Sequence, residues 1–265
     1  MSTDLFDATR LQGGSSTGPA LVAESLGYRY RRPLGGHTAW ELHDVSLTLR
    51  GGTVTGLLGR NGSGKSTLLG LLAGLRRPGA GRVLLDGQEV WDEPGPRAAV
   101  ALLGTRRCLL ENNRLTDSIA LWRTTRPLWS SRDLARYLEL FEVDVDCVPR
   151  RLSQGQRSAV DAAFALASHS PVLLLDEVHL GMDAVVRRRF WDALLAQYAA
   201  EQGTVVIAAH EVEEIANLVE DVVILTGGTV GAAGSADDLR AACTPPGAPL
   251  ADLTDVLEHY SAKGA

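Results

Sequence analysis

The sequence predicts an α/β protein whose core is a mostly parallel sheet, with an antiparallel β-lobe before the core and a helical insertion within it. In the second half of the chain, short apolar runs alternate with segments of helical spacing, as in a parallel sheet with helices on both faces. Before residue 50, apolar and polar residues alternate, which is typical of half-buried antiparallel strands. Residues 106–151 show helical spacing instead and form the predicted insertion.

Composition and charge narrow the class of protein. The chain has 265 residues, of which 45% are hydrophobic, enough for one sizeable core or a core with a smaller lobe. Its net charge of −6 disfavours a general nucleic-acid binder, so no nucleic-acid partner is expected. The three cysteines, Cys108, Cys147 and Cys243, are far apart and lack C-x-x-C spacing. This disfavours a disulfide framework or zinc site and fits a reducing compartment.

The sequence carries no membrane or secretion signal. No apolar run approaches the roughly 20 residues that a membrane-spanning helix needs. The N-terminal residues lack a basic region followed by an apolar stretch, the pattern of a secretion signal. We therefore expect a cytoplasmic protein that reaches a membrane only through a partner.

The first half of the chain is predicted to contain the β-lobe and the first core strands. Residues 1–20 are polar, rich in Ser, Thr and Gly, and expected to be disordered. Asp86-Gly87 is the expected turn of a hairpin. The predicted strands are 21–31, 40–49, 53–58, the hairpin 82–90, and 100–103, with a helix from Ser66 to Leu75.

The second half is predicted to complete the core. After the insertion, helices are expected at 152–168, 184–200 and 212–219, and strands at 171–177, 204–209, 221–225 and 229–232. The chain then divides into a disordered segment (1–20), one domain (21–240) and a short C-terminal tail (241–265). An amphipathic stretch at 250–260 is expected to be a peripheral element or a partner contact.

A glycine-rich loop between a strand and a helix carries the clearest chemical signal. Residues 59–66 fit G-x-x-x-x-G-K-[ST], the phosphate-binding P-loop. Its glycines let backbone N–H groups turn inward, and the helix N-terminus adds partial positive charge. Lys65 is predicted to reach the β- and γ-phosphates and Ser66 to bind Mg²⁺. The predicted nucleotide-binding residues are Gly59, Arg60, Asn61, Gly62, Ser63, Gly64, Lys65, Ser66 and Thr67.

Polar residues follow two apolar strands in the second half. Asp176 and Glu177 end the run 172–175, and ligands of such sheets lie at the carboxyl ends of strands. Asp176 is predicted to help hold Mg²⁺, and Glu177 to polarise the attacking water as a catalytic residue. His210 follows the next strand and is predicted to contact the γ-phosphate and orient that water.

Residues 152–157, Leu-Ser-Gln-Gly-Gln-Arg, are similar to the signature L-S-G-G-Q, with Gln154 where Gly is usual. Signature, P-loop and the strand ending at Asp176 stand in the order found in one family. From Leu21 to Arg240 the chain therefore resembles the ATP-binding subunit of an ABC transporter. Ser153 also fits an ordinary helix N-cap, and the two interpretations are compatible because a capped helix N-terminus can hold phosphate.

The resemblance implies a P-loop NTPase (RecA-like) fold and Mg²⁺-dependent hydrolysis of ATP to ADP and phosphate. It implies a second ATP-binding subunit, identical or different, so that two subunits enclose two ATP molecules. Tyr30 matches the aromatic residue that stacks on adenine, with Tyr28 as the fallback. Residues that match contacts to the opposite subunit's ATP are Ser153, Gln154, Gly155, Gln156 and Asp183.

The resemblance further implies an integral membrane permease that docks beside the insertion and holds the protein at the inner face of the membrane.

Three departures from the family's pattern stand out. The Gln expected after the strand 100–103 is missing, and Thr105 lies nearest to its place. The Pro expected after the catalytic Glu is Val178, and the stretch 31–41 is longer than usual.

Within the family, the chain looks most like bacterial exporters of drugs, antibiotics or peptides, so the expected function is to power such a transporter. Two alternatives stay open. One is a soluble ATP-driven switch without a transporter, and the other is a cassette with reduced hydrolysis, suggested by the missing Gln near Thr105.

Overall fold

The computed structural model describes residues 18–30, 39–104, 109–209 and 211–262. It contains a four-stranded sheet in the order β2-β1-β4-β5 and a six-stranded sheet in the order β10-β9-β3-β8-β7-β6. The strands are β1 (Leu21–Tyr28), β2 (Leu42–Leu49), β3 (Val54–Leu58), β4 (Ala80–Leu85), β5 (Gln88–Glu89), β6 (Val100–Gly104), β7 (Val172–Asp176), β8 (Thr204–Ala208), β9 (Asp221–Thr226) and β10 (Thr229–Ser235).

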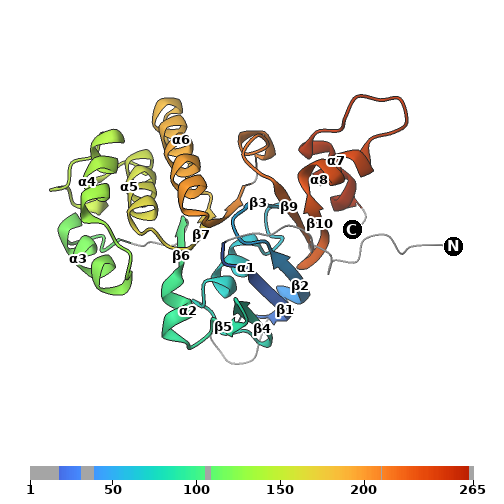
Figure 1. Ribbon diagram of the computed structural model, residues 1–265, viewed down its shortest axis with the longest axis horizontal. Coiled ribbons are helices and arrows are strands. Elements are labelled where there is room, and N and C mark those ends of the chain that lie inside the picture. Colours follow the sequence, from blue (N-terminus) through green and yellow to red (C-terminus); the bar gives the residue numbers. More distant parts are fainter. Residues whose placement is uncertain (1–17, 31–38, 105–108, 210, 263–265) are drawn as a thin grey trace.

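Helices α3 and α4 lie at one end of the molecule, and α7 and α8 lie at the other (Figure 1). They are α1 (Lys65–Leu72), α2 (Pro94–Ala99), α3 (Leu115–Thr125), α4 (Ser131–Leu140), α5 (Gln154–Ala167), α6 (Ala184–Glu201), α7 (Ala236–Cys243) and α8 (Leu253–Ala262), with 3₁₀ turns η1 (Pro149–Arg151) and η2 (Val212–Glu214). None of the described helices combines the length and the apolar character that crossing a membrane requires.

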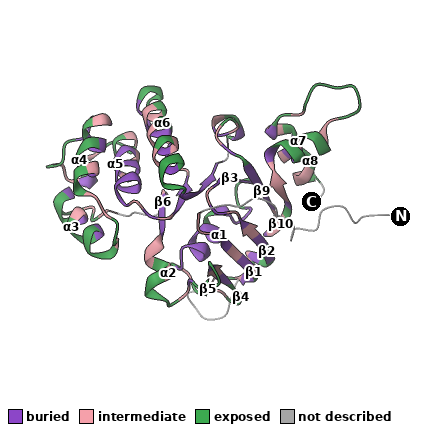
Figure 2. Cartoon of the chain, viewed as in Figure 1, coloured by how far each residue is buried: buried purple, intermediate pink, exposed green. Residues whose placement is uncertain are grey.

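The six-stranded sheet confirms the predicted parallel core. β3 pairs in parallel with β8 and β9, β8 with β7, and β7 with β6, while β10 runs antiparallel to β9. Every residue of β3, β7 and β8 is buried, because helices cover both faces of such a sheet. Figure 2 shows the buried residues gathered along these strands and on the inner sides of the helices.

The four-stranded sheet is the predicted antiparallel lobe. β1 lies between β2 and β4, and both pairings are antiparallel. One hydrophobic cluster joins this lobe to α1 and to the strand β7, and includes Leu21, Leu68 and Leu174. The helix α1 is therefore packed by both sheets, which fixes the loop at its N-terminus.

The predicted helical insertion consists of α3 and α4 packed on α5. Phe164 of α5 is fully buried and meets Trp122 and Trp129 edge to face, with ring centroids 5.5 and 5.3 Å apart. Such aromatic pairs add about 0.5–1.5 kcal/mol beyond the buried area. The insertion is thus anchored to the same helix that begins at the signature stretch.

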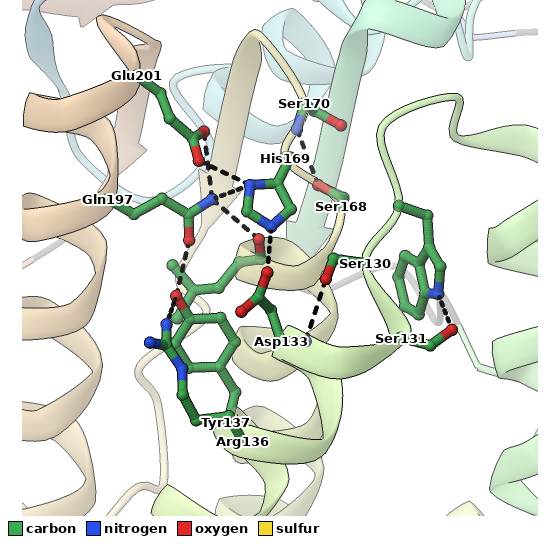
Figure 3. A network of polar contacts seen from close by, with 12 residues as sticks. Ser130, Ser131, Asp133, Arg136, Tyr137, Ser168, His169, Ser170, Gln197 and Glu201 are labelled. Carbon is green, nitrogen blue, oxygen red and sulfur yellow. Dashed lines mark hydrogen bonds and ion pairs between the residues drawn. The ribbon is translucent and has the colours of Figure 1, made fainter.

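A polar junction around His169 joins α4, the end of α5 and α6 (Figure 3). The Nε2 atom of His169 lies 3.0 Å from Asp133 of α4, and its Nδ1 atom lies 2.6 Å from Glu201 of α6. Gln197 donates to the Leu166 carbonyl oxygen at 3.0 Å. A hydrogen bond from Ser130 and the His169 ring lower the pKa of Asp133. The junction therefore holds the insertion against the sheet domain.

Replacing His169 by Ala is expected to destabilise the protein by about 2 kcal/mol, because two carboxylates lose a hydrogen-bond partner. The melting temperature should fall by roughly 4–8 °C for a chain of this size. His43→Ala, at an exposed position of β2, is the matched control. Because the pKa of Asp133 is lowered, its stabilisation is present above about pH 4 and is lost as the pH falls. Equal melting temperatures for the two variants would contradict this role.

Two expectations about the C-terminal third were wrong. The helix predicted at 212–219 is the single 3₁₀ turn η2 followed by another turn, with Leu218 N–H donating to the Ile215 carbonyl oxygen. These turns bury Ile215 and Val219 against Gly56 of β3, so tertiary packing overrides the local helical pattern. The stretch expected to be peripheral forms α8, whose Leu253 and Val256 join the main core.

Residue 240, the predicted domain boundary, lies inside α7, and the division into domains stays a prediction. Residues 1–17, within the segment expected to be disordered, lie outside the described residues.

Candidate nucleotide-binding site

The glycine-rich loop runs from the end of β3 to the first turn of α1, as predicted. Gly64 caps α1 with φ +101°, and a Cβ there would lie 2.6 Å from the Leu42 side chain. Glycine is therefore needed for both conformation and space. The helix begins at Lys65 and ends at Leu72, three residues before its predicted end.

Lys65 folds back over this loop. Its Nζ atom donates to the carbonyl oxygens of Gly59 at 2.7 Å and Arg60 at 3.3 Å. Burial lowers the pKa of Lys65, and the nearby carboxylates of Glu177 and Asp176 offset only part of that shift. The ammonium group thus lies close to the end of β7 and inside a loop of backbone groups, an arrangement that suits phosphate binding.

The loop and its surroundings fit a nucleotide with Mg²⁺. Ser63 is buried, and its hydroxyl oxygen has no hydrogen-bond partner among the described residues. Ser66 is exposed in the first turn of α1, and Asp176 is only 5% exposed at the end of β7. Hydroxyl and carboxylate oxygens are the hard donors that Mg²⁺ prefers.

Asp176 is the last residue of β7, which lies between β6 and β8, and Glu177 follows it. Asp176 pairs with Gly104 of β6 and with Ala208 of β8. A Cβ on Gly104 would lie 1.9 Å from the Asp176 carbonyl oxygen, so the two strand ends touch. Glu177 turns out of the strand with φ +56°, and its N–H donates to the Ala208 carbonyl oxygen at 3.2 Å. Both residues line one cavity, and both carboxylates act on Lys65.

The signature stretch forms a capped helix start. Ser153 is the N-cap of α5, and a capping box joins it to Gln156 through hydrogen bonds of 3.0 and 3.2 Å. A Cβ on Gly155 would lie 2.2 Å from the Gly181 carbonyl oxygen. The loop that contains Gly181 leads to Asp183, whose carboxylate caps α6. The predicted opposite-subunit contacts therefore gather around two adjoining helix starts.

Tyr30 lies beside the glycine-rich loop. Its hydroxyl group is 2.8 Å from the Thr67 hydroxyl group, and the Arg76 guanidinium lies 4.9 Å from its ring centroid. Tyr28 meets the ring edge to face at 5.1 Å, and Arg76 donates to the Tyr28 hydroxyl oxygen at 3.0 Å. Both candidate aromatic residues are thus held at this site by one arginine.

Some predicted site residues lie outside the described residues, namely His210 and Thr105, together with the long stretch 31–38. Their proposed roles stay predictions, as do the catalytic, metal-binding and nucleotide-binding roles of the described ones.

Sequence reasoning missed Arg76 and Asp161. Arg76 lies 46 residues after Tyr30, and nothing in the local sequence connects them. Asp161 did carry a signal, because it interrupts the apolar part of α5 between Val160 and Ala162. It lines a cavity of about 210 Å³ that also reaches Asp176 and Glu177.

Comparisons with known proteins agree on one family. A family model described as "ABC transporter" matches residues 42–179. The chain is 32% identical over 203 residues to a probable sulfate/thiosulfate import ATP-binding protein CysA of Chlorella vulgaris, covering 75% of this chain and 86% of that protein. It is 33% identical over 214 residues to the methionine import ATP-binding protein MetN of Bradyrhizobium diazoefficiens, covering 75% of this chain and 60% of that protein.

Several other relatives are also longer than the matched region. The chain spans 57% of the length of the sulfate/thiosulfate import ATP-binding protein CysA of Synechococcus elongatus, at 34% identity.

Solved structures support the fold. The structure of an ATP-binding subunit of an ABC transporter superposes with a TM-score of 0.78 at 25% identity, covering 91% of this chain and 99% of that one. A dimeric, post-hydrolysis cassette, MJ0796 with ADP and phosphate, gives a TM-score of 0.71 at 22% identity, covering 81% and 98%. The second likeness concerns the fold alone.

Proposed function

The chain belongs to the ABC transporter family, and on that premise we propose that it is the ATP-binding and ATP-hydrolysing subunit of a membrane transporter. Cassettes of this family hydrolyse ATP, dimerise and pair with membrane permease subunits. The observation that carries the proposal is the meeting of Lys65, Asp176 and Glu177 at one edge of the sheet.

The proposed chemistry divides among these residues. Lys65 exchanges its contacts with the loop carbonyl groups for the β- and γ-phosphates of ATP. Ser66 and Asp176 would hold Mg²⁺, which supplies charge neutralisation at the phosphates. Glu177 accepts a hydrogen bond from the attacking water and then its proton. Among the residues outside the described ranges, His210 is proposed to orient that water.

The second half of the site is proposed to come from a partner subunit. Ser153 and Gly155 lie at a helix N-terminus, which attracts the γ-phosphate of the ATP bound to the opposite subunit. Asp183 caps the adjoining helix and is exposed. One chain therefore provides a loop for its own ATP and a helix start for the other.

The direction of transport is not set by the ATP-binding subunit alone. The names of the matched relatives describe import of sulfate, thiosulfate or methionine, so they give no support to the expected export of drugs, antibiotics or peptides.

The proposal is tested by purifying the tagged chain from detergent-solubilised membranes of its native cell. Co-purification of an integral membrane protein with several helices is expected, together with Mg²⁺-dependent ATP hydrolysis. A stable complex with soluble proteins only would favour the alternative of an ATP-driven switch without a transporter.

Tyr30 is proposed to stack on the adenine ring. Tyr30→Ala is expected to raise the KM for ATP about threefold to tenfold, because an aromatic pair contributes about 0.5–1.5 kcal/mol. Tyr30→Phe keeps the ring but loses the contact with Thr67, so its KM should stay within about twofold of wild type. Steady-state hydrolysis at varied ATP checks this. If Tyr28→Ala raises KM instead, the adenine contact belongs to Tyr28.

A further inference from the structure

Asp161 is a carboxyl group inside the signature helix that the proposed chemistry does not use. It lies two turns beyond Ser153 in α5 and is flanked by the buried Val160 and Ala162. Asp161 is half-buried, and its Oδ1 atom is shielded from solvent without a hydrogen-bond partner among the described residues. A shielded carboxyl oxygen without a hydrogen-bond partner costs free energy.

The cavity beside Asp161 reaches the catalytic edge of the sheet. It has a volume of about 210 Å³, and its polar lining includes Glu111, Arg157, Asp161, Asp176 and Glu177. A cavity needs only about 10–15 Å³ and two to four polar partners to hold one water molecule. The space therefore has room for a short chain of hydrogen-bonded water between α5 and the end of β7.

Within the part of the chain that the structure describes, Arg157 is the cation that acts on Asp161, and Arg157 has other contacts. Arg157, one turn earlier in α5, donates to the Arg150 carbonyl oxygen at 3.0 Å and lies 3.6 Å from Glu111. Burial raises the pKa of Asp161 to about 7, and Arg157 opposes that shift only in part. Near neutral pH, a large share of Asp161 is therefore a carboxylic acid, which can donate as well as accept a hydrogen bond.

We propose that Asp161 is a positioning residue for Glu177, acting through water in this cavity, an inference that rests on the proposed function. The Asp161 carboxylic acid donates to a water molecule, and that chain of water donates to the Glu177 carboxylate. Glu177 is thereby held in the orientation in which it polarises the attacking water. When Asp161 ionises, it stops donating and its negative charge faces Asp176, Glu177 and Glu111.

The stability of the protein offers a second readout of the same group. Since the folded pKa is raised above the unfolded value, the folded state holds an extra proton between the two values. Stability from Asp161 is therefore present at low pH and lost as the pH rises to about 7 and above. Asp161→Asn should raise the melting temperature at pH 8, and this gain should shrink towards pH 5.

The test compares Mg²⁺-dependent ATP hydrolysis by the full chain and its variants between pH 6 and 9. Asp161→Ala should lower kcat about tenfold, with the KM for ATP within about twofold of wild type. Asp161→Asn, which can still donate, should keep kcat within about threefold and should flatten the loss of activity at alkaline pH. Asp192→Asn, an exposed acid of α6, is the matched control and should behave as wild type.

Measuring Glu177→Gln in the same assay distinguishes a failure of the Asp161 proposal from a failure of the proposed function. If wild type exceeds Glu177→Gln but Asp161→Ala keeps the wild-type kcat and pH profile, the role of Asp161 is overturned while the proposed function stands. An equal loss in Asp161→Ala and Asp161→Asn with an unchanged pH profile also overturns it, because that result indicates a structural role. If wild type does not exceed Glu177→Gln, both proposals fail.

Discussion

Replacing Glu177 by Gln is expected to lower the rate of ATP hydrolysis by about a hundredfold or more while ATP still binds. The amide keeps the size of the side chain but cannot accept the proton of the attacking water. The corresponding rise in the activation barrier is on the order of 3 kcal/mol or more. Glu177 follows β7 with a positive φ of +56°, so its backbone leaves the extended path of the strand.

The measurement is phosphate release by the purified protein with its partner, at saturating ATP and Mg²⁺. Glu213→Gln, an exposed acid in η2, is the control and should match wild type. Because the substitution slows hydrolysis without removing the phosphate contacts, Glu177→Gln should also accumulate as an ATP-bound dimer. Equal rates for wild type and Glu177→Gln would contradict the catalytic role and would favour a cassette that hardly hydrolyses ATP.

Lys65→Ala is expected to weaken ATP binding by about a hundredfold or more and to abolish hydrolysis. The ammonium group would make charge-assisted hydrogen bonds to two phosphates, each worth about 1.5–3 kcal/mol. Lys65→Arg should not restore binding, because Lys65 is only 7% exposed and a planar guanidinium does not replace a compact ammonium group there. Equilibrium titration with a fluorescent ATP analogue measures the loss.

Folding of this variant can be checked independently. Burial lowers the pKa of Lys65. Keeping its ammonium group charged in the folded state therefore reduces the free energy of unfolding at neutral pH, and this reduction becomes smaller as the pH rises. Loss of the Lys65 hydrogen bonds to the Gly59 and Arg60 carbonyl oxygens opposes the gain from removing this charge, so the melting temperature of Lys65→Ala without nucleotide should stay close to that of wild type. Arg77→Ala, at an exposed position beyond α1, is the control for loss of a positive charge. Wild-type ATP affinity in Lys65→Ala would overturn the assignment of the glycine-rich loop.

The parts of the fold that were predicted correctly are those in which local pattern and tertiary packing agree. The run before Gly59 is apolar because β3 is buried on both faces, and the loop glycines match the conformation that Gly64 adopts. The 212–219 segment failed because the packing of Ile215 and Val219 against Gly56 decides its shape. That contact joins residues more than 150 positions apart, so no local pattern encodes it.

The residues of the candidate site also divide into those that the sequence predicts and those that depend on tertiary packing. Asp176 and Glu177 could be placed beside the loop because parallel strands bring their carboxyl ends to one edge. The arginine that holds Tyr30 could not be found, since the contact of Arg76 with its ring depends on how two sheets meet around α1. Asp161 could have been found, because a lone acid inside an apolar helix run already predicts a perturbed group.

The order of strands also indicates how readily each part of the candidate site opens to let its amide protons exchange with solvent. β3 lies inside the sheet with a parallel neighbour on each side, whereas β6 lies at its edge. Amide protons of the strand before Lys65 can exchange with solvent only when the whole sheet opens, while those of β6 need only local fraying. The glycine-rich loop therefore follows an interior, slowly exchanging strand. The cavity beside Gly104 borders a part that opens at lower free energy.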